Sequence, residues 1–194
     1  MTVHVHAADR DMVSAREDDS KARRFRAAAL PYLDDVYTLA RYLLRNPADA
    51  EDATQECYLR AFRHFDSFRG GPIKPWLLAI LRNVCRAEYA RRGALAGQGE
   101  DLDAAEHCTH GLWADDAATP EATALGQLDA DSVQQLIAGL PAPFREALVL
   151  REMNDLSYRE IAEIAGVPVG TVMSRLARAR GLLRAAWIAK EKEP

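Results

Sequence analysis

Two polar side chains of the kind that read DNA bases, Ser174 and Arg178, lie four positions apart in the segment LSYREIAEIAGVPVGTVMSRLARAR. At 100° per residue they would share one helix face with the small residues Gly170 and Ala177. A small, polar and basic face suits the major groove, where Ser and Arg reach base edges and phosphates. The opposite face would carry an apolar stripe of Val172, Leu176, Ala179 and Leu183.

Local signals predict a second, shorter helix before this one. Ser157 and Glu160 have the spacing of a capping box, with Leu156 and Ile161 at the positions of a hydrophobic staple. Gly166 predicts a left-handed stop, and Pro168 suits the first turn of the next helix. The segment therefore predicts a helix-turn-helix that binds DNA, although an ordinary antiparallel helix pair with a solvated basic face would show the same pattern.

Composition places the chain among ordinary globular proteins. Of its 194 residues, 48% are hydrophobic and 28% charged, with a net charge of -4. No apolar run reaches the length of a membrane span and the first residues lack a signal peptide's apolar core, so we expect a cytoplasmic protein without membrane insertion. Cys57, Cys85 and Cys108 form no CxxC pair, and the first two lie in helical patterns as buried small residues.

Charge is segregated along the chain. Eight basic residues occur from Arg60 to Arg92 and six from Arg175 to Lys192, while nine acidic residues and no basic ones lie between Arg92 and Arg145. Because charges act over a Debye length of about 10 Å, the two basic blocks can bind nucleic acid despite the negative total.

The N-terminal half predicts three helices after a mobile arm. A long amphipathic helix begins near Lys21, is eased at Pro31 and ends at Asn46-Pro47, and a second helix follows with its acidic residues first and its basic residues last. The third, from about Pro75 to Arg92, would turn Trp76, Leu77, Ile80, Leu81 and Val84 inward, with Arg82, Asn83, Arg86, Arg91 and Arg92 on its polar side. Between them, a loop with Phe65, Phe68 and Trp76 could stack on unpaired bases, or these rings could be core residues.

In chain order, these pieces resemble the bacterial extracytoplasmic-function (ECF) sigma factors. DAEDATQECYLRAFRHFDSFRG and PWLLAILRNVCRAEYARR are similar to region two of that family, and LPAPFREALVLREMNDLSYREIAEIAGVPVGTVMSRLARAR is similar to region four. The resemblance implies a sigma factor that binds core RNA polymerase and promoter DNA, recognises the -35 and -10 elements and melts the promoter. It also implies inhibition by an anti-sigma factor.

The resemblance also implies roles for single residues. Asp52, Gln55 and Glu56 would dock on core polymerase. The surface for the -10 element and strand separation would comprise Lys74, Trp76, Asn83 and Arg86, with Asn83 at a pocket for a flipped base. The -35 element would be read by Thr171, Met173, Ser174, Ala177 and Arg178. Met173 stands where relatives often carry a basic residue, and it cannot donate a hydrogen bond, so we expect an apolar contact or none.

We therefore expect an all-α protein of two helical domains joined by a flexible acidic linker. The expected parts are a mobile arm (1–20), a region-two domain (21–92), the linker (93–131), a region-four domain (132–188) and a tail (189–194). No catalytic spacing occurs, so we expect no enzyme activity and no cofactor. His107, Cys108 and His110 offer three soft ligands, one fewer than tetrahedral zinc normally takes, so we expect no metal. Two rival hypotheses are a dimeric helix-turn-helix regulator and a metal or thiol sensor built on that cluster.

Overall fold

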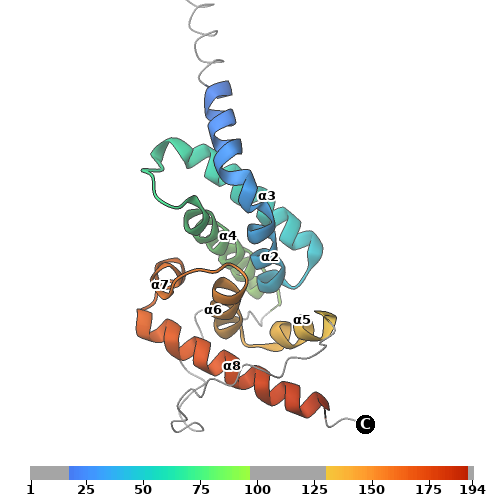
Figure 1. Ribbon diagram of the computed structural model, residues 1–194. Helices are drawn as coiled ribbons and strands as arrows, with labels where there is room; N and C mark the ends of the chain where they lie inside the picture. The colour runs from blue at the N-terminus through green and yellow to red at the C-terminus, as the bar shows by residue number, and fades with distance from the viewer. Residues whose placement is uncertain (1–17, 97–129, 192–194) are drawn as a thin grey trace, which may run out of the picture.

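The computed structural model describes residues 18–96 and 130–191, and these residues are helical with short turns (Figure 1). The all-α class predicted from periodicity is confirmed. The histidine and cysteine cluster at 107–110 and most of the predicted linker lie outside the described residues. The elements are a helix over 18–29, η1 (Leu30–Tyr32), α2 (Leu33–Leu44), α3 (Pro47–His64), η2 (Phe65–Ser67), α4 (Ile73–Ala96), α5 (Ala130–Gly139), α6 (Ala142–Glu152), α7 (Tyr158–Ala165) and α8 (Val169–Glu191).

Local chemistry sets the boundaries in the N-terminal lobe, residues 18–96. The first predicted helix is interrupted at Pro31, where the 3-10 turn η1 leads into α2. α2 ends where Arg45 adopts a left-handed conformation with φ 61°. The Asn46 side chain then caps α3 by accepting hydrogen bonds from the amides of Ala48 and Asp49, at 2.9 and 3.3 Å. Pro47 follows in the first turn, where its missing N–H costs nothing.

The core of the N-terminal lobe lies among α2, α3 and α4, which pack against one another. α3 contributes mostly small buried side chains, Ala50, Ala53, Cys57 and Ala61, which let its neighbours approach closely. The Cys57 thiol donates a hydrogen bond to the Leu77 carbonyl at 3.4 Å. Burial raises the pKa of both Cys57 and Cys85 to about 12, so both thiols remain protonated at neutral pH. The prediction that these two cysteines are buried is confirmed.

Helix α6 is the centre of the C-terminal lobe, residues 130–191. Every residue from Ala142 to Leu150 is buried, because α6 packs against α7 and α8 on its own side and against α2 of the N-terminal lobe (Figure 1). The buried Arg145 guanidinium donates to the carbonyls of Ala138 and Leu140, at 2.8 and 2.9 Å. These carbonyls at the end of α5 would otherwise lack intrahelical donors. Arg145 thereby joins α5 to α6.

A buried ion pair connects the two lobes. Arg82 Nε on α4 lies 2.5 Å from Glu146 Oε1 on α6, and the two side chains are only 3% and 1% exposed. The expectation that Arg82 belongs to the polar side of its helix is therefore wrong. A cation at that position is stable in the interior because a carboxylate from the other lobe meets it there. Arg45 adds a second link between the lobes by donating to the Ala138 carbonyl.

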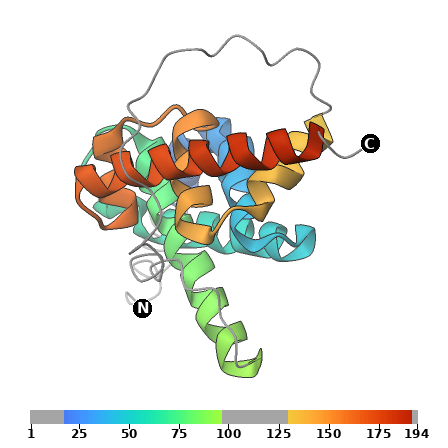
Figure 2. The ribbon, with the colours of Figure 1, turned by 90° about the horizontal axis from the view of Figure 1, so that it is seen from below.

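The two lobes leave one end of α4 projecting. Figure 2 shows the C-terminal turns of α4 extending beyond the other helices, with α8 crossing the body of the molecule. Within the ranges 18–96 and 130–191, no helix is both long enough and apolar enough to cross a membrane.

The ion pair predicts a strong non-additivity between two substitutions. Glu146→Leu should lower the free energy of unfolding by about 3 to 5 kcal/mol, because it removes the carboxylate that faces the buried Arg82. Arg82→Met together with Glu146→Leu should cost much less, since neither member of the pair is then left charged and unpaired in the interior. Urea denaturation followed by circular dichroism measures both. Equal losses in the single and double variants would show that Arg82 does not depend on Glu146.

Candidate nucleic-acid and polymerase interface

The turn between α7 and α8 is built as its sequence predicts. The Ser157 Oγ accepts from the Glu160 amide at 3.3 Å, and the Glu160 carboxylate accepts from the Ser157 amide at 2.8 Å. The hydrogen bonds from the Ser157 hydroxyl and amide hold the pKa of Glu160 below its ordinary value. Gly166 ends α7 with φ 68°, and the amide of Val167 then donates back to the Ala162 carbonyl at 3.1 Å. α8 begins at Val169, with the Pro168 carbonyl accepting its first hydrogen bonds.

One face of α8 is exposed along its first half. Met173, Ser174, Ala177 and Arg178 are exposed, whereas Val172, Leu176 and Ala179 are buried. Thr171 is half-buried and accepts a hydrogen bond from Ser174 Oγ through its carbonyl, at 2.9 Å. The helix therefore has the orientation that its periodicity predicts, and it presents one cation and one hydroxyl among small and apolar side chains.

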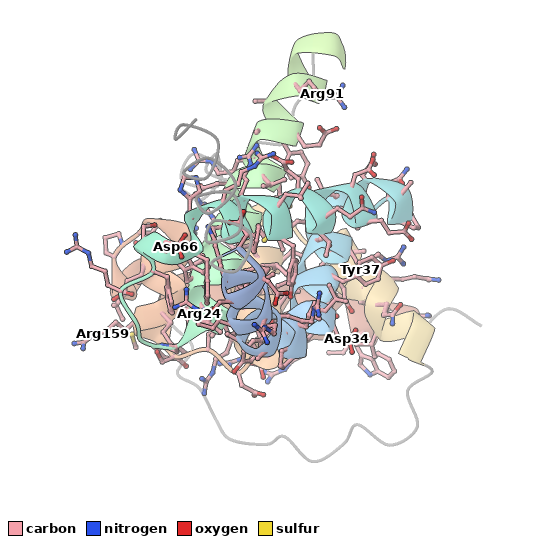
Figure 3. All side chains as sticks on the ribbon, turned by 90° about the horizontal axis from the view of Figure 1, so that it is seen from above. Arg24, Asp34, Tyr37, Asp66, Arg91 and Arg159 are labelled. Atoms are coloured by element: carbon pink, nitrogen blue, oxygen red, sulfur yellow. The ribbon has the colours of Figure 1, made fainter. Side chains whose placement is uncertain are left out.

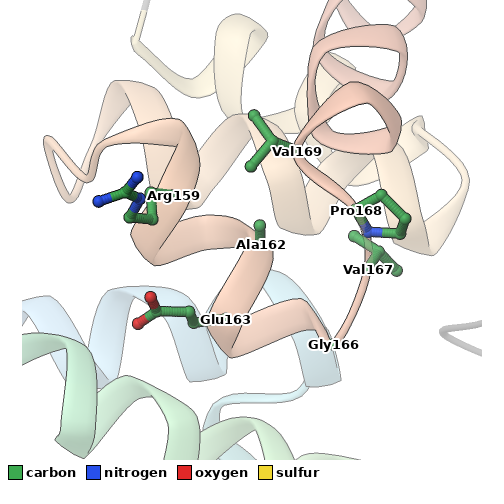
Figure 4. A pocket seen from close by; sticks show the side chains of 7 residues that line it. All are labelled: Arg159, Ala162, Glu163, Gly166, Val167, Pro168 and Val169. Atoms are coloured by element: carbon green, nitrogen blue, oxygen red, sulfur yellow. The ribbon is translucent and has the colours of Figure 1, made fainter.

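Arg159 is a further cation beside this face that the sequence analysis did not single out. It is exposed on α7 and lines a shallow hollow with Gly166, Val169 and neighbouring residues of the turn (Figure 4). Figure 3 shows Arg159 at the edge of the molecule, directed away from its body. In helix-turn-helix proteins the first helix crosses the DNA backbone, so a cation at this position suits a phosphate. The sequence signal that could have identified Arg159 is its position on the polar side of α7.

The residues assigned to the -10 element separate into two groups on α4. Asn83 and Arg86 are exposed, and Asn83 lies two turns from Trp76 on the same side of the helix. Lys74 lies on the opposite side, half-buried, with its ammonium 3.1 Å from the Asp35 carboxylate of α2. The structure brings Trp76, Asn83 and Arg86 to one surface and turns Lys74 toward α2.

The aromatic residues of the predicted loop form a continuous ring contact. Trp76 lies against Phe68 with ring centroids 4.9 Å apart, Phe68 stacks on Phe65 at 6.4 Å, and Phe65 meets the buried Phe25 edge-on at 5.3 Å. Lys21 lies over the ring of Phe62 and Arg24 over that of Phe65, and both cations make ion pairs with Asp66. The rings of Phe65, Phe68 and Trp76 are half-buried against the core, so part of each ring remains accessible.

The polar residues assigned to polymerase docking share one face of α3. Asp52 and Gln55 are exposed, and Glu56 is half-buried with its carboxylate 2.6 Å from Arg60 Nε. Leu59 lies on the same face, three and four positions after Glu56 and Gln55, and is 52% exposed. The sequence analysis missed Leu59, although an apolar residue at helical spacing from three polar ones was its signal. One exposed apolar side chain is ordinary on a protein surface, so Leu59 adds an apolar contact to this polar face without marking an interface by itself.

Comparison with known families matches both lobes. The family described as "Sigma-70 region 2" matches residues 29–94, and "Sigma-70, region 4" matches residues 130–183. The chain is 36% identical over 169 residues to the ECF RNA polymerase sigma-E factor of Escherichia coli, covering 85% of this chain and 86% of that protein. It is 38% identical over 153 residues to the corresponding factor of Haemophilus influenzae, covering 75% and 77%.

Two further comparisons extend this result. The chain is 37% identical over 155 residues to the ECF RNA polymerase sigma factor SigE of Mycolicibacterium smegmatis, covering 79% of this chain and 57% of that protein. The solved structure of the sigma factor RpoE of Bartonella quintana, in complex with the anti-sigma factor NepR, matches with a TM-score of 0.66 and 29% identity. That match covers 84% of this chain and 96% of RpoE. The two sigma regions occur in order, each on its own lobe, and the chain belongs to the ECF sigma factors of RNA polymerase.

Proposed function

We propose that this sigma factor reads the -35 element with α8 and the -10 element with the outer face of α4, while the outer face of α3 docks on core RNA polymerase. The exposed face of α8 carries this proposal, because a capped and tightly stopped α7 holds it outward with Ser174 and Arg178 accessible. Core polymerase supplies the catalysis, and the sigma factor supplies promoter choice. Such work takes place in the cytoplasm, where the polymerase and its template are.

In the -35 contact, some residues would read bases and others would position α8 in the groove. Arg178 offers the paired donors that suit guanine, and Ser174 suits several bases. Arg159 on α7 would hold a phosphate and fix the register of α8 in the groove. Thr171 lies beside this face with its carbonyl occupied by Ser174, and we assign it a supporting position.

The -10 contact would centre on Asn83, with Arg86 beside it for the backbone phosphates. An amide offers both donors and an acceptor, which suits the edge of an unpaired base. The half-buried Trp76 would lie at the border of this surface. Lys74 would act indirectly, since its ion pair with Asp35 stabilises the start of α4 against α2.

Control by an anti-sigma factor is part of the same proposal. The Bartonella quintana relative is solved with one bound, and this chain matches that sigma factor over nearly its whole length. The exposed apolar side chains Leu30, Leu33 and Leu59 offer contact points on the N-terminal lobe for a protein partner.

Transcription with and without core polymerase tests the whole proposal. Each lobe exposes few basic residues on its proposed DNA-facing side, so the isolated protein should bind promoter duplex weakly in physiological salt. With core polymerase it should start transcription at specific sites on genomic fragments, read by run-off transcription and footprinting. Tight, specific binding by the protein alone as a dimer would instead favour an independent regulator.

Arg178→Ala should reduce transcription that depends on the -35 element. The free energy of promoter binding should become less favourable by about 1 to 3 kcal/mol, the usual loss for one base contact. The variant's association with core polymerase should remain unchanged, because Arg178 is exposed and lies away from the packed side of α8. Arg184→Ala, an exposed arginine further along α8, is the matched control and should have little effect. Loss of folding or of core binding in Arg178→Ala would show that the residue is structural.

Asn83→Ala should impair open-complex formation more than initial promoter binding. On premelted templates the wild-type holoenzyme should still discriminate the -10 base, and the variant should not. Gln55→Ala removes another exposed amide, on α3, and should lower affinity for core polymerase while keeping that discrimination. Equal base preference in wild type and Asn83→Ala would remove Asn83 from the site.

A further inference from the structure

An exposed apolar row runs along the proposed recognition face of α8. Val169, Met173 and Ala177 lie at four-residue intervals, so their side chains follow one another along the same side of the helix. Met173 is 54% exposed and Val169 is 41% exposed. A single exposed apolar side chain is ordinary, but a row of them offers continuous contact to an apolar part of a ligand.

A polar row lies directly beside it, one position further along the sequence. Gly170, Ser174 and Arg178 are all exposed. The Ser174 hydroxyl donates its hydrogen to the Thr171 carbonyl at 2.9 Å, which leaves its lone pairs available to accept. Arg178 is a donor only. The face thus pairs apolar contacts with an acceptor and a set of donors, one helical row apart.

Gly170 presents no side chain at the start of this face of α8. A Cβ added there would meet no atom within 4 Å, and the backbone is not in a left-handed conformation. Glycine within a helix is less favourable than alanine, and neither packing nor backbone geometry requires it here. Because Gly170 has no side chain, a base pair could approach the backbone of α8 closely between Val169 and Ser174.

We infer that Met173 recognises the 5-methyl group of a thymine in the -35 element. The inference rests on the proposed reading of that element by α8. Thymine presents its methyl group and its O4 acceptor side by side in the major groove, which matches an apolar row beside a polar one. The unbranched, polarisable methionine side chain adapts to a methyl group in the groove, with Val169 and Ala177 extending the apolar contact.

Replacing thymine by uracil isolates this contact. A promoter is first selected by the wild-type holoenzyme from a library randomised upstream of the start site. Each thymine of its -35 element, on either strand, is then replaced singly by deoxyuridine, which removes the methyl group and keeps every hydrogen-bonding group. At subsaturating holoenzyme, one replacement should lower run-off initiation about fourfold, the ratio expected for one buried methyl group.

Variants of α8 assign the effect to Met173. Met173→Ala should initiate equally on the thymine and uracil templates, at about the rate of wild type on uracil. Alanine favours the helix, so folding should be retained, as circular dichroism and core binding would verify. Met173→Leu should restore part of the methyl dependence. Leu182→Ala changes an exposed apolar residue on the opposite side of α8 and should keep the full wild-type ratio.

The outcomes distinguish a failure of the Met173 contact from a failure of the proposed reading of the -35 element by α8. Wild-type indifference to every uracil, or undiminished methyl dependence in Met173→Ala, would overturn the role of Met173 while leaving the reading of the element by α8 intact. A holoenzyme that selects no upstream sequence at all would instead overturn the proposed role of α8. A methyl effect that disappears only in Met173→Ala, and persists in Leu182→Ala, would establish the contact.

Discussion

The burial of α6 where the two lobes meet is the constraint on which the described structure depends. α6 meets α2 on one side and α7 and α8 on the other, and its residues from Ala142 to Leu150 are all buried. A helix in that position has no surface for charged residues unless they find partners. Arg145 finds two carbonyls at the end of α5, and Glu146 finds Arg82 of the other lobe. Any motion that separated the lobes would expose the apolar side of α6 and break the pair between Arg82 and Glu146.

The surfaces assigned to partners all lie outside this shared core. The outer faces of α8, α4 and α3 carry exposed side chains, so each can hold polar groups without a desolvation cost. Hydrogen bonds between residues close in sequence fix where the helices that carry these faces begin and end. The capping box at Ser157 fixes the start of α7, the left-handed Gly166 fixes its end before α8, and the Asn46 cap fixes the start of α3.

Residue type alone does not show which basic side chains are available to bind nucleic acid. Of the basic residues on α4, Arg82 and Lys74 stabilise the fold through carboxylates, whereas Arg86 is exposed on the side of Asn83. On α8, Arg175 is buried and Arg180 pairs with Glu152 at 2.8 Å, which leaves Arg178 on the recognition face. The same applies to the aromatic residues, whose half-buried rings make a chain of contacts into the core.

The sequence by itself determined the all-α class, the order of the two sigma regions and the local design of the helix-turn-helix. Capping boxes, left-handed glycines and apolar periodicity act between residues a few positions apart, so they can be read without knowing the fold. Only the tertiary structure decided that Arg82 is buried and that Lys74 faces α2. Periodicity assigns every charged residue to solvent and every apolar residue to the core. The exceptions depend on groups distant in sequence, as when Glu146, 64 positions away, neutralises Arg82.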